Sequence, residues 1–168
     1  MADLAELLMM EHASIRVISF SSHGMDSLDN FVVFNNYLKN VHIDVEEKIL
    51  FPLVVDFDWA DRKEFEATVN RIKSDHRLIE TLAENLIKWK ESGKEELIAL
   101  RLPLFYKTLT DHNNSEEGQI FPRWVYLDSE NTRSALREAL SVIESNSEEL
   151  YEKVTGISHD LLDYIRKR

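Results

Sequence analysis

Two copies of one histidine and glutamate pattern lie seventy residues apart in this chain. The first begins at His42 and the second at His112, and each reads His-x-x-x-Glu-Glu, three further residues, then Phe-Pro. Side chains four residues apart share one face of an α-helix, about 6 Å from each other. His42 with Glu46, and His112 with Glu116, can therefore direct an imidazole and a carboxylate toward a single point. Such nitrogen and oxygen donors are ligands for transition metals, so each copy is a candidate half of a metal site.

Two further histidines extend this pattern. His12 and His76 each follow an acidic residue and precede an isoleucine by three positions. The four histidines are 30, 34 and 36 residues apart, a spacing that fits one histidine in the middle of each of four consecutive antiparallel helices. Mid-helix positions of such helices lie at one level of a bundle. The predicted metal ligands are His12, His42, Glu46, His76, His112 and Glu116.

The cost of burying these groups favours a metal site. A buried carboxylate without a partner costs several kcal/mol, and metal coordination offsets that cost. Two carboxylates from opposite helices can each bridge two ions, and two histidines can complete each ion, so the pattern predicts a pair of ions. Histidine with carboxylate suits iron and manganese, with zinc as a further option. The alternative is a buried network of histidine and glutamate hydrogen bonds without metal.

Long helices must position these residues. The chain has only four glycines and three prolines, so few breaks are expected. The predicted helices run from about Asp3, with Glu6 as a capping partner, to a cap at Gly24; from Asp26 or Ser27 to Pro52; from about Asp61 to Ser92, with Gly93 as the stop; from Lys94 or Glu95 to Pro122; and from about Ser129 to Val154. We expect a break or bend at Pro103 and a short tail helix capped by Ser158.

These helices predict an all-α fold, an up-down-up-down four-helix bundle with an additional C-terminal helix. The length of 168 residues predicts a single domain, with the metal-binding bundle over about residues 1–125 and a C-terminal helical extension over about 129–168. The sequence assigns no role to the extension, which can dock on the bundle or bind another chain.

Composition narrows the classes of partner. The chain has 20 Lys and Arg against 31 Asp and Glu, a net charge of −11, which disfavours nucleic acid and anionic membrane surfaces. The absence of cysteine excludes disulfides, thiolate catalysis and iron–sulfur ligation. The N-terminus lacks a basic leader, and no apolar run approaches the roughly 20 residues of a membrane span. We therefore expect a cytoplasmic protein.

The full pattern of four histidines and two His-x-x-x-Glu-Glu motifs, each followed by Phe-Pro, resembles the hemerythrin-like (HHE cation-binding) domain over residues 1 to about 125. The resemblance implies a non-haem four-helix bundle holding two iron ions joined by an oxo or hydroxo bridge. It also implies a small-molecule ligand, namely dioxygen, nitric oxide or peroxide, or a role in sensing iron or oxygen.

The chain departs from the oxygen-carrying hemerythrins at two places. Those proteins have a second histidine on the third helix, where this chain has Ile72 and Glu80, and an aspartate where it has Glu117. The two ions would then be nearly equivalent, each with an open position, which favours redox chemistry or sensing over reversible oxygen carriage. Glu80 is an alternative seventh ligand. Glu47 and Glu117 point away from their histidines, so we expect them at the surface or behind the ligands.

Three functions from different classes follow from this site. The first is a binding or sensing protein for dioxygen, nitric oxide, peroxide or iron. The second is a di-iron enzyme that removes peroxide, similar to a catalase or peroxidase. The third is a bundle in which the metal only holds the helices together. The sequence leaves open the choice among them, the oligomeric state and any redox partner.

Overall fold

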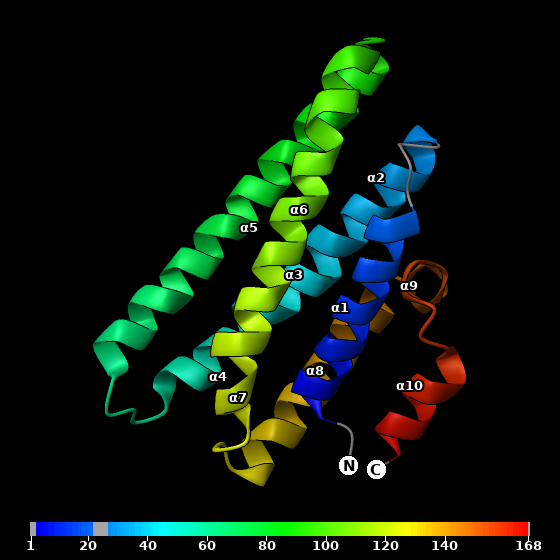
Figure 1. Ribbon diagram of the computed structural model, residues 1–168. Coiled ribbons are helices and arrows are strands. Elements are labelled where there is room, and N and C mark those ends of the chain that lie inside the picture. Colours follow the sequence, from blue (N-terminus) through cyan, green and yellow to red (C-terminus); the bar gives the residue numbers. More distant parts are fainter. Residues whose placement is uncertain (1–2, 22–26, 168) are drawn as a thin grey trace.

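The computed structural model describes residues 3–21 and 27–167, and the regular elements within these ranges are all helices. Four helical rods form the bundle (Figure 1). The first rod is α1 (Leu4–Ser21), the third is α5 (Arg62–Glu91) and the fourth is α6 (Glu95–Gln119). The second rod is a run of five segments, α2 (Leu28–Tyr37), η1 (Leu38–His42), α3 (Ile43–Val45), η2 (Glu46–Leu50) and α4 (Phe51–Asp56), where η marks a π-helical turn.

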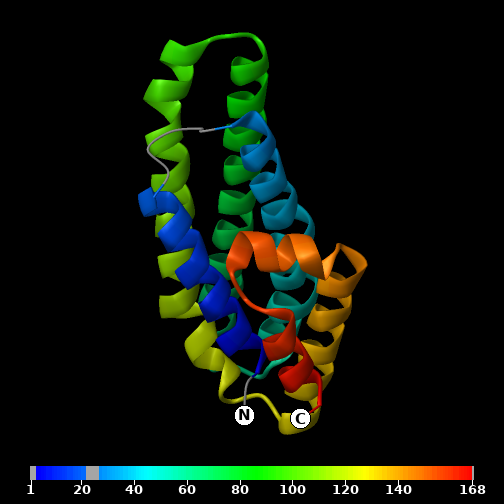
Figure 2. The ribbon, with the colours of Figure 1, turned by 90° about the vertical axis from the view of Figure 1, so that its right-hand side faces the viewer.

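Two apolar clusters fill the bundle, and each rod passes from one to the other. The cluster that contains Phe51 includes Leu8, Ile49, Ile72 and Ile120. The cluster that contains Phe105 includes Ile15, Val41, Ile79 and Leu109. Along the chain, α1 passes from the Phe51 cluster to the Phe105 cluster, the second rod returns, α5 repeats the first direction and α6 returns again. The predicted up-down-up-down order is confirmed, and the hairpin of α5 and α6 extends beyond the other two rods (Figures 1 and 2).

The predicted helix ends agree with the structure where capping residues set them. The backbone N–H of Glu6 donates to the Asp3 side chain at 2.9 Å, and the N–H of Asp3 donates to the Glu6 side chain at 3.3 Å. The Ser27 side chain accepts from the N–H of Asn30 and so caps the second rod. Gly93 has a φ of 68°, which is the left-handed conformation that stops α5. The predicted cap at Gly24 lies outside the described residues.

Prolines end fewer helices than predicted. The second rod continues through Pro52 to Asp56, so the predicted end at Pro52 is wrong. The π-turn just before it, in which the N–H of Phe51 bonds to the carbonyl of Glu46, widens the helix where the proline ring would otherwise clash. The helix α6 is continuous through Pro103, which is exposed, so water can satisfy the carbonyl that the proline leaves free.

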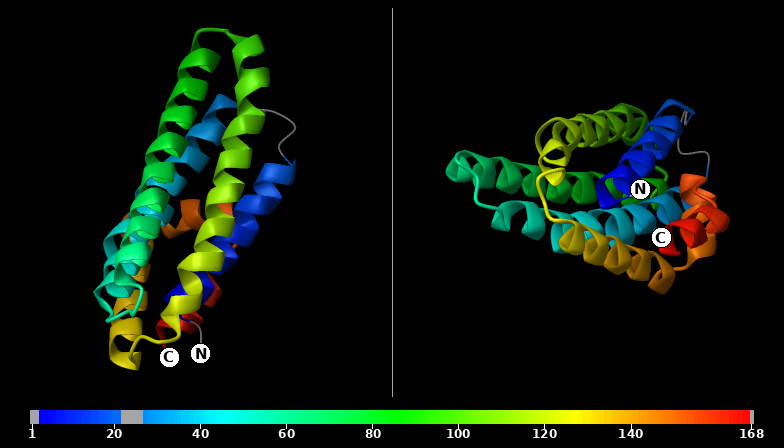
Figure 3. Two further views of the ribbon diagram at one scale, coloured as in Figure 1. Left: turned by 60° about the vertical axis from the view of Figure 1, so that its left-hand side comes forward. Right: turned by 90° about the horizontal axis from the view of Figure 1, so that it is seen from below.

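The C-terminal extension is three helices rather than one long helix and a tail. After the short α7 (Phe121–Trp124), the chain forms α8 (Ser129–Ser145), α9 (Glu148–Thr155) and α10 (His159–Arg166). The helix α8 lies beside the second rod, α9 runs across the bundle against α1 and α2, and α10 returns toward the end where the N-terminus lies (Figures 2 and 3). Ser158 caps α10 as predicted. The single helix predicted over 129–154 is wrong, because the chain turns at Asn146 and Ser147.

Ser147 stores backbone strain at this turn. Its φ of 84° and ψ of 105° are a conformation that favours glycine, although its side chain also caps α9 by accepting from the N–H of Leu150. Relief of strain should exceed the small loss of the cap and the added chain entropy, so Ser147→Gly should stabilise the fold by about 1 kcal/mol. Thermal unfolding should show a midpoint roughly 2–4 °C higher. Ser147→Ala keeps the strain and removes the cap, so it should lower the midpoint, and a glycine variant less stable than wild type would contradict this account.

Candidate metal centre

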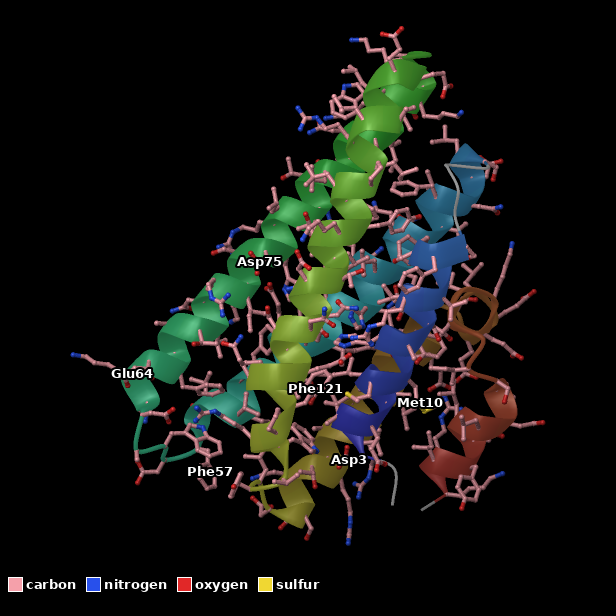
Figure 4. The ribbon with its side chains drawn as sticks, viewed as in Figure 1. Asp3, Met10, Phe57, Glu64, Asp75 and Phe121 are labelled. Carbon is pink, nitrogen blue, oxygen red and sulfur yellow. The ribbon has the colours of Figure 1, made fainter. Side chains whose placement is uncertain are left out.

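All six predicted ligand residues meet in one buried layer between the two apolar clusters. Their side chains are at most 2% exposed, and they are His12, His42, Glu46, His76, His112 and Glu116. Figure 4 shows side-chain nitrogen and oxygen atoms gathered in the middle of the bundle, between α1 and α6. Each rod contributes a histidine, and the second and fourth rods each add a glutamate one turn later. The four histidines therefore share one level, as their spacing in the sequence predicts.

The ligand atoms form two groups that share both glutamates. One group is His12, His42, Glu46 and Glu116; the other is His76, His112, Glu46 and Glu116; in each, the candidate ligand atoms all lie within 4.8 Å of one another. Each group could hold one metal ion with two imidazole nitrogens and two carboxylate oxygens. Glu80, the alternative seventh ligand, belongs to neither group and is partly exposed.

The two oxygens of Glu46 face different groups. Oε1 lies 3.2 Å from Nε2 of His42 and 3.5 Å from Nε2 of His12, while Oε2 lies 3.4 Å from Nε2 of His76. Metal bonds of 2.0–2.2 Å place neighbouring ligand atoms about 3.0–3.5 Å apart, so these separations fit metal coordination. Oε2 of Glu116 likewise lies 3.4 Å from Nε2 of His12 and 3.3 Å from Nε2 of His112. Each carboxylate therefore lies between histidines of both groups.

Several of these atoms lack the hydrogen bonds that burial demands. Within residues 3–21 and 27–167, both carboxylate oxygens of Glu46 and of Glu116 are buried without a hydrogen-bond partner, as are the Nε2 atoms of His12 and His42. Buried polar atoms in folded proteins are otherwise almost always paired, because an unpaired one costs about 1–3 kcal/mol. The unpaired atoms all point into the same layer, and they are the atoms that would bind metal. The donor set therefore fits a pair of cations better than a network of hydrogen bonds.

The pKa values of the metal-free site show the same conflict. Burial lowers the pKa of His76, but its contacts with Glu46 and Glu47 outweigh burial and raise that pKa to about 10. Burial and then the positive charge of His76 lower the pKa of His112 to about 3. Without metal, the protonated Nε2 of His76 therefore donates a hydrogen bond to Nε2 of His112, and the two nitrogens are 2.8 Å apart. Burial and then the charge of Glu46 raise the pKa of Glu116 to about 7, so the two glutamates resist being ionised together.

Three outer carboxylates orient the histidines. The Nδ1–H of His12 donates to Glu117 at 2.9 Å, that of His42 to Glu11 at 2.7 Å, and that of His76 to Glu47 at 2.7 Å. Such partners fix the ring and the tautomer, leaving Nε2 free to bind metal, and they raise its basicity. Glu47 and Glu117 thus lie behind the ligands, one of the two positions that the sequence predicts. Nδ1 of His112 has no such partner among the described residues.

The Phe-Pro ending of each motif also has a role in the site. Phe121 stacks on the ring of His12, with centroids 5.3 Å apart and planes 24° apart. Phe51 stacks on His76, with centroids 5.9 Å apart and planes 8° apart. Each phenylalanine therefore covers a histidine from the other half of the repeat. Both phenylalanines belong to the Phe51 cluster, so their rings close the layer on that side (Phe121 in Figure 4).

Sequence reasoning missed three residues beside this site, Glu11, Tyr37 and Tyr151. Glu11 precedes His12 in the repeated pattern, but it received no role, and Tyr151 lies in the extension. Glu11 is 2% exposed and accepts hydrogen bonds from Tyr37, Tyr151 and His42. Burial and the charge of Glu11 raise the pKa of both tyrosines, so both remain hydroxyl donors. The sequence signal that could have indicated Glu11 is an acidic residue directly before a predicted ligand, in the repeated pattern that begins at Glu11 and at Asp75.

A four-helix bundle that encloses four histidines and two shared carboxylates belongs to the class of metal-binding helical bundles. The family model for the hemerythrin HHE cation binding domain matches residues 3–124, and the chain belongs to this family. Helices α8, α9 and α10 lie beyond the matched residues. Comparisons with curated proteins and with solved structures gave no significant match. Within residues 3–21 and 27–167, no helix is long and apolar enough to cross a membrane.

Proposed function

We propose that this chain is a non-haem di-iron protein that binds a small oxidant or diatomic molecule, namely dioxygen, nitric oxide or peroxide. The observation that carries the proposal is the pair of four-residue groups that share Glu46 and Glu116. Each group supplies two nitrogen and two oxygen donors, a mixed set that suits iron. Two bound irons would supply electrons and vacant coordination positions for such a ligand.

The protein's own residues account for why such a site would be selective for small ligands. The layer is closed by Phe51 and Phe121 on one side and by the Phe105 cluster on the other, so bulky molecules and most water are excluded. The partly exposed Glu47 and Glu117 connect His76 and His12 to the surface and can exchange protons with solvent. The outer carboxylates hold the histidine rings, so the ligand atoms need little rearrangement when metal binds.

Metal analysis followed by anaerobic titration tests this function. Protein loaded with Fe²⁺ should hold two irons per chain and should develop near-ultraviolet absorption bands on addition of dioxygen, nitric oxide or peroxide. Spectra that reverse on degassing would assign reversible binding. Steady consumption of peroxide that is lost in His112→Ala would assign a peroxide-removing enzyme instead. Protein that binds two metals but whose spectrum responds to none of the three molecules would contradict the proposal and leave a structural role for the metal.

A further inference from the structure

The carboxylate of Glu11 is a buried junction between the candidate centre and the C-terminal extension. It accepts three hydrogen bonds, from Nδ1 of His42 at 2.7 Å, from the hydroxyl of Tyr37 at 2.9 Å and from the hydroxyl of Tyr151 at 2.6 Å. The four residues come from four different elements, α1, η1, α2 and α9. All four side chains are at most 5% exposed, so solvent cannot replace any of these bonds.

Tyr151 is the one member of this group from outside the matched family domain. It lies in α9, which packs on α1 and α2, and its ring meets that of Tyr37 edge to face at 5.8 Å. The Ser14 hydroxyl fixes the end of α9 by donating to the carbonyl of Thr155 at 2.5 Å. The strained turn at Ser147 sets where α9 begins. These contacts hold the Tyr151 hydroxyl against Glu11.

The three outer carboxylates are compensated in different ways. Arg16 donates to Glu117 at 2.7 Å, so a cation balances that charge, and Glu47 is partly exposed to solvent. Glu11 is buried from solvent and contacts no lysine or arginine in the part of the chain that the structure describes, and the two tyrosine hydroxyls are its neutral donors. A carboxylate with fewer donors is a stronger acceptor, and it draws the Nδ1 proton of a histidine more strongly. The histidine then donates more electron density through Nε2 and stabilises the oxidised state of a bound metal.

We propose that Tyr151 is a positioning residue of the metal centre, through which the C-terminal extension tunes the electron donation of His42. By donating to Glu11, the Tyr151 hydroxyl limits how strongly this carboxylate draws the Nδ1 proton of His42. The inference rests on the proposed function, because it requires a metal ion bound by His42. It gives the extension a role that the bundle alone does not require.

Reduction potentials of the iron-loaded full-length protein test this inference through their sign. Tyr151→Phe removes one donor and leaves Glu11 charged, so the potential of the centre should fall. Glu11→Gln replaces the carboxylate by a neutral acceptor, so the potential should rise and iron should bind about tenfold more weakly. Tyr126→Phe removes the hydroxyl of a tyrosine that is 64% exposed and should change neither quantity. A purely structural role for Tyr151 and Glu11 would not give shifts of opposite sign.

The outcomes separate this inference from the proposed function. Wild-type protein that takes up no iron overturns both. Iron-loaded wild type with a Tyr151→Phe potential equal to that of Tyr126→Phe overturns the tuning role and leaves the proposed function intact. Should Tyr151→Phe fail to fold, Tyr37→Phe removes another hydroxyl from the same carboxylate and should also lower the potential. An unchanged potential in folded Tyr37→Phe would equally overturn the inference.

Discussion

Glu46→Ala should abolish tight binding of both metal ions, whereas His12→Ala should abolish only one. Glu46 belongs to both four-residue groups, and its two oxygens face different histidines, so its loss would remove a donor from each of the two proposed ions. His12 belongs to one group, and its removal leaves Glu46, His76, His112 and Glu116 intact. Metal affinity at each damaged group should fall by more than the roughly 100-fold that loss of an outer partner can cost. Metal analysis after gel filtration should give two ions for wild type, one for His12→Ala and none for Glu46→Ala.

Glu64→Ala is the matched control for this experiment. Glu64 is an exposed glutamate near the start of α5, far from the centre (Figure 4), and its loss should leave both ions in place. Circular dichroism of the metal-free variants establishes that each one folds. If Glu46→Ala does not fold, Glu46→Gln is used in its place, because glutamine preserves the side-chain volume. A Glu46 variant that keeps two ions at wild-type affinity would show that this carboxylate is not a shared ligand.

The position of the site along the bundle could be predicted from the sequence, because the histidine and glutamate spacings that indicate it are local and occur twice. A histidine in the middle of each helix and a glutamate one turn later need only helical periodicity to share a face. The antiparallel order of the rods then brings His12, His42, His76 and His112 together, and the structure places all four in one layer. The described helices also begin or end close to the predicted residues at four places where a capping side chain or a glycine fixes the end, namely Asp3, Ser27, Gly93 and Ser158.

The residues that sequence reasoning missed depend on packing between distant segments. The contact of Tyr151 with Glu11 joins positions 140 residues apart, and no periodic pattern indicates such a pair. The turn at Ser147 was missed for a related reason, since a serine with positive φ carries no glycine signal and is held there by the packing of α9. The π-helical turns of the second rod could not be predicted from the sequence either. The motif at His112 has the same spacing as that at His42 but lies in a regular α-helix.

The asymmetry of the outer carboxylates refines the predicted equivalence of the two ions. Both groups have the same donor types, as the absence of a second histidine on the third helix suggested. Behind them, however, His12 and His42 each have a carboxylate partner, whereas only His76 has one in the other group. Because such partners raise ligand basicity, the group with His12 and His42 should bind the more strongly held ion. The two halves of the repeat thus supply the same candidate ligands but not the same number of outer carboxylates.

Removal of the metal should lower the unfolding temperature, and the difference should grow with pH. Free metal at 1,000 times its Kd stabilises the fold by about 4 kcal/mol per site, which corresponds to roughly 10–15 °C in a chain of this length.

In the metal-free protein the pKa of His76 is raised from 6.5 to about 10, so its protonation stabilises the fold fully below about pH 6.5 and less as pH rises toward 10. Metal binding requires neutral imidazoles and displaces this proton, so metal affinity falls as pH falls. Thermal melts of metal-loaded and chelator-treated protein from pH 5 to 9 should therefore diverge with rising pH and converge in acid. Calorimetric titrations with metal, in buffers of different ionisation enthalpy, should show release of at least the His76 proton. Melting temperatures that do not change on addition of metal at any pH would exclude metal binding by this buried layer.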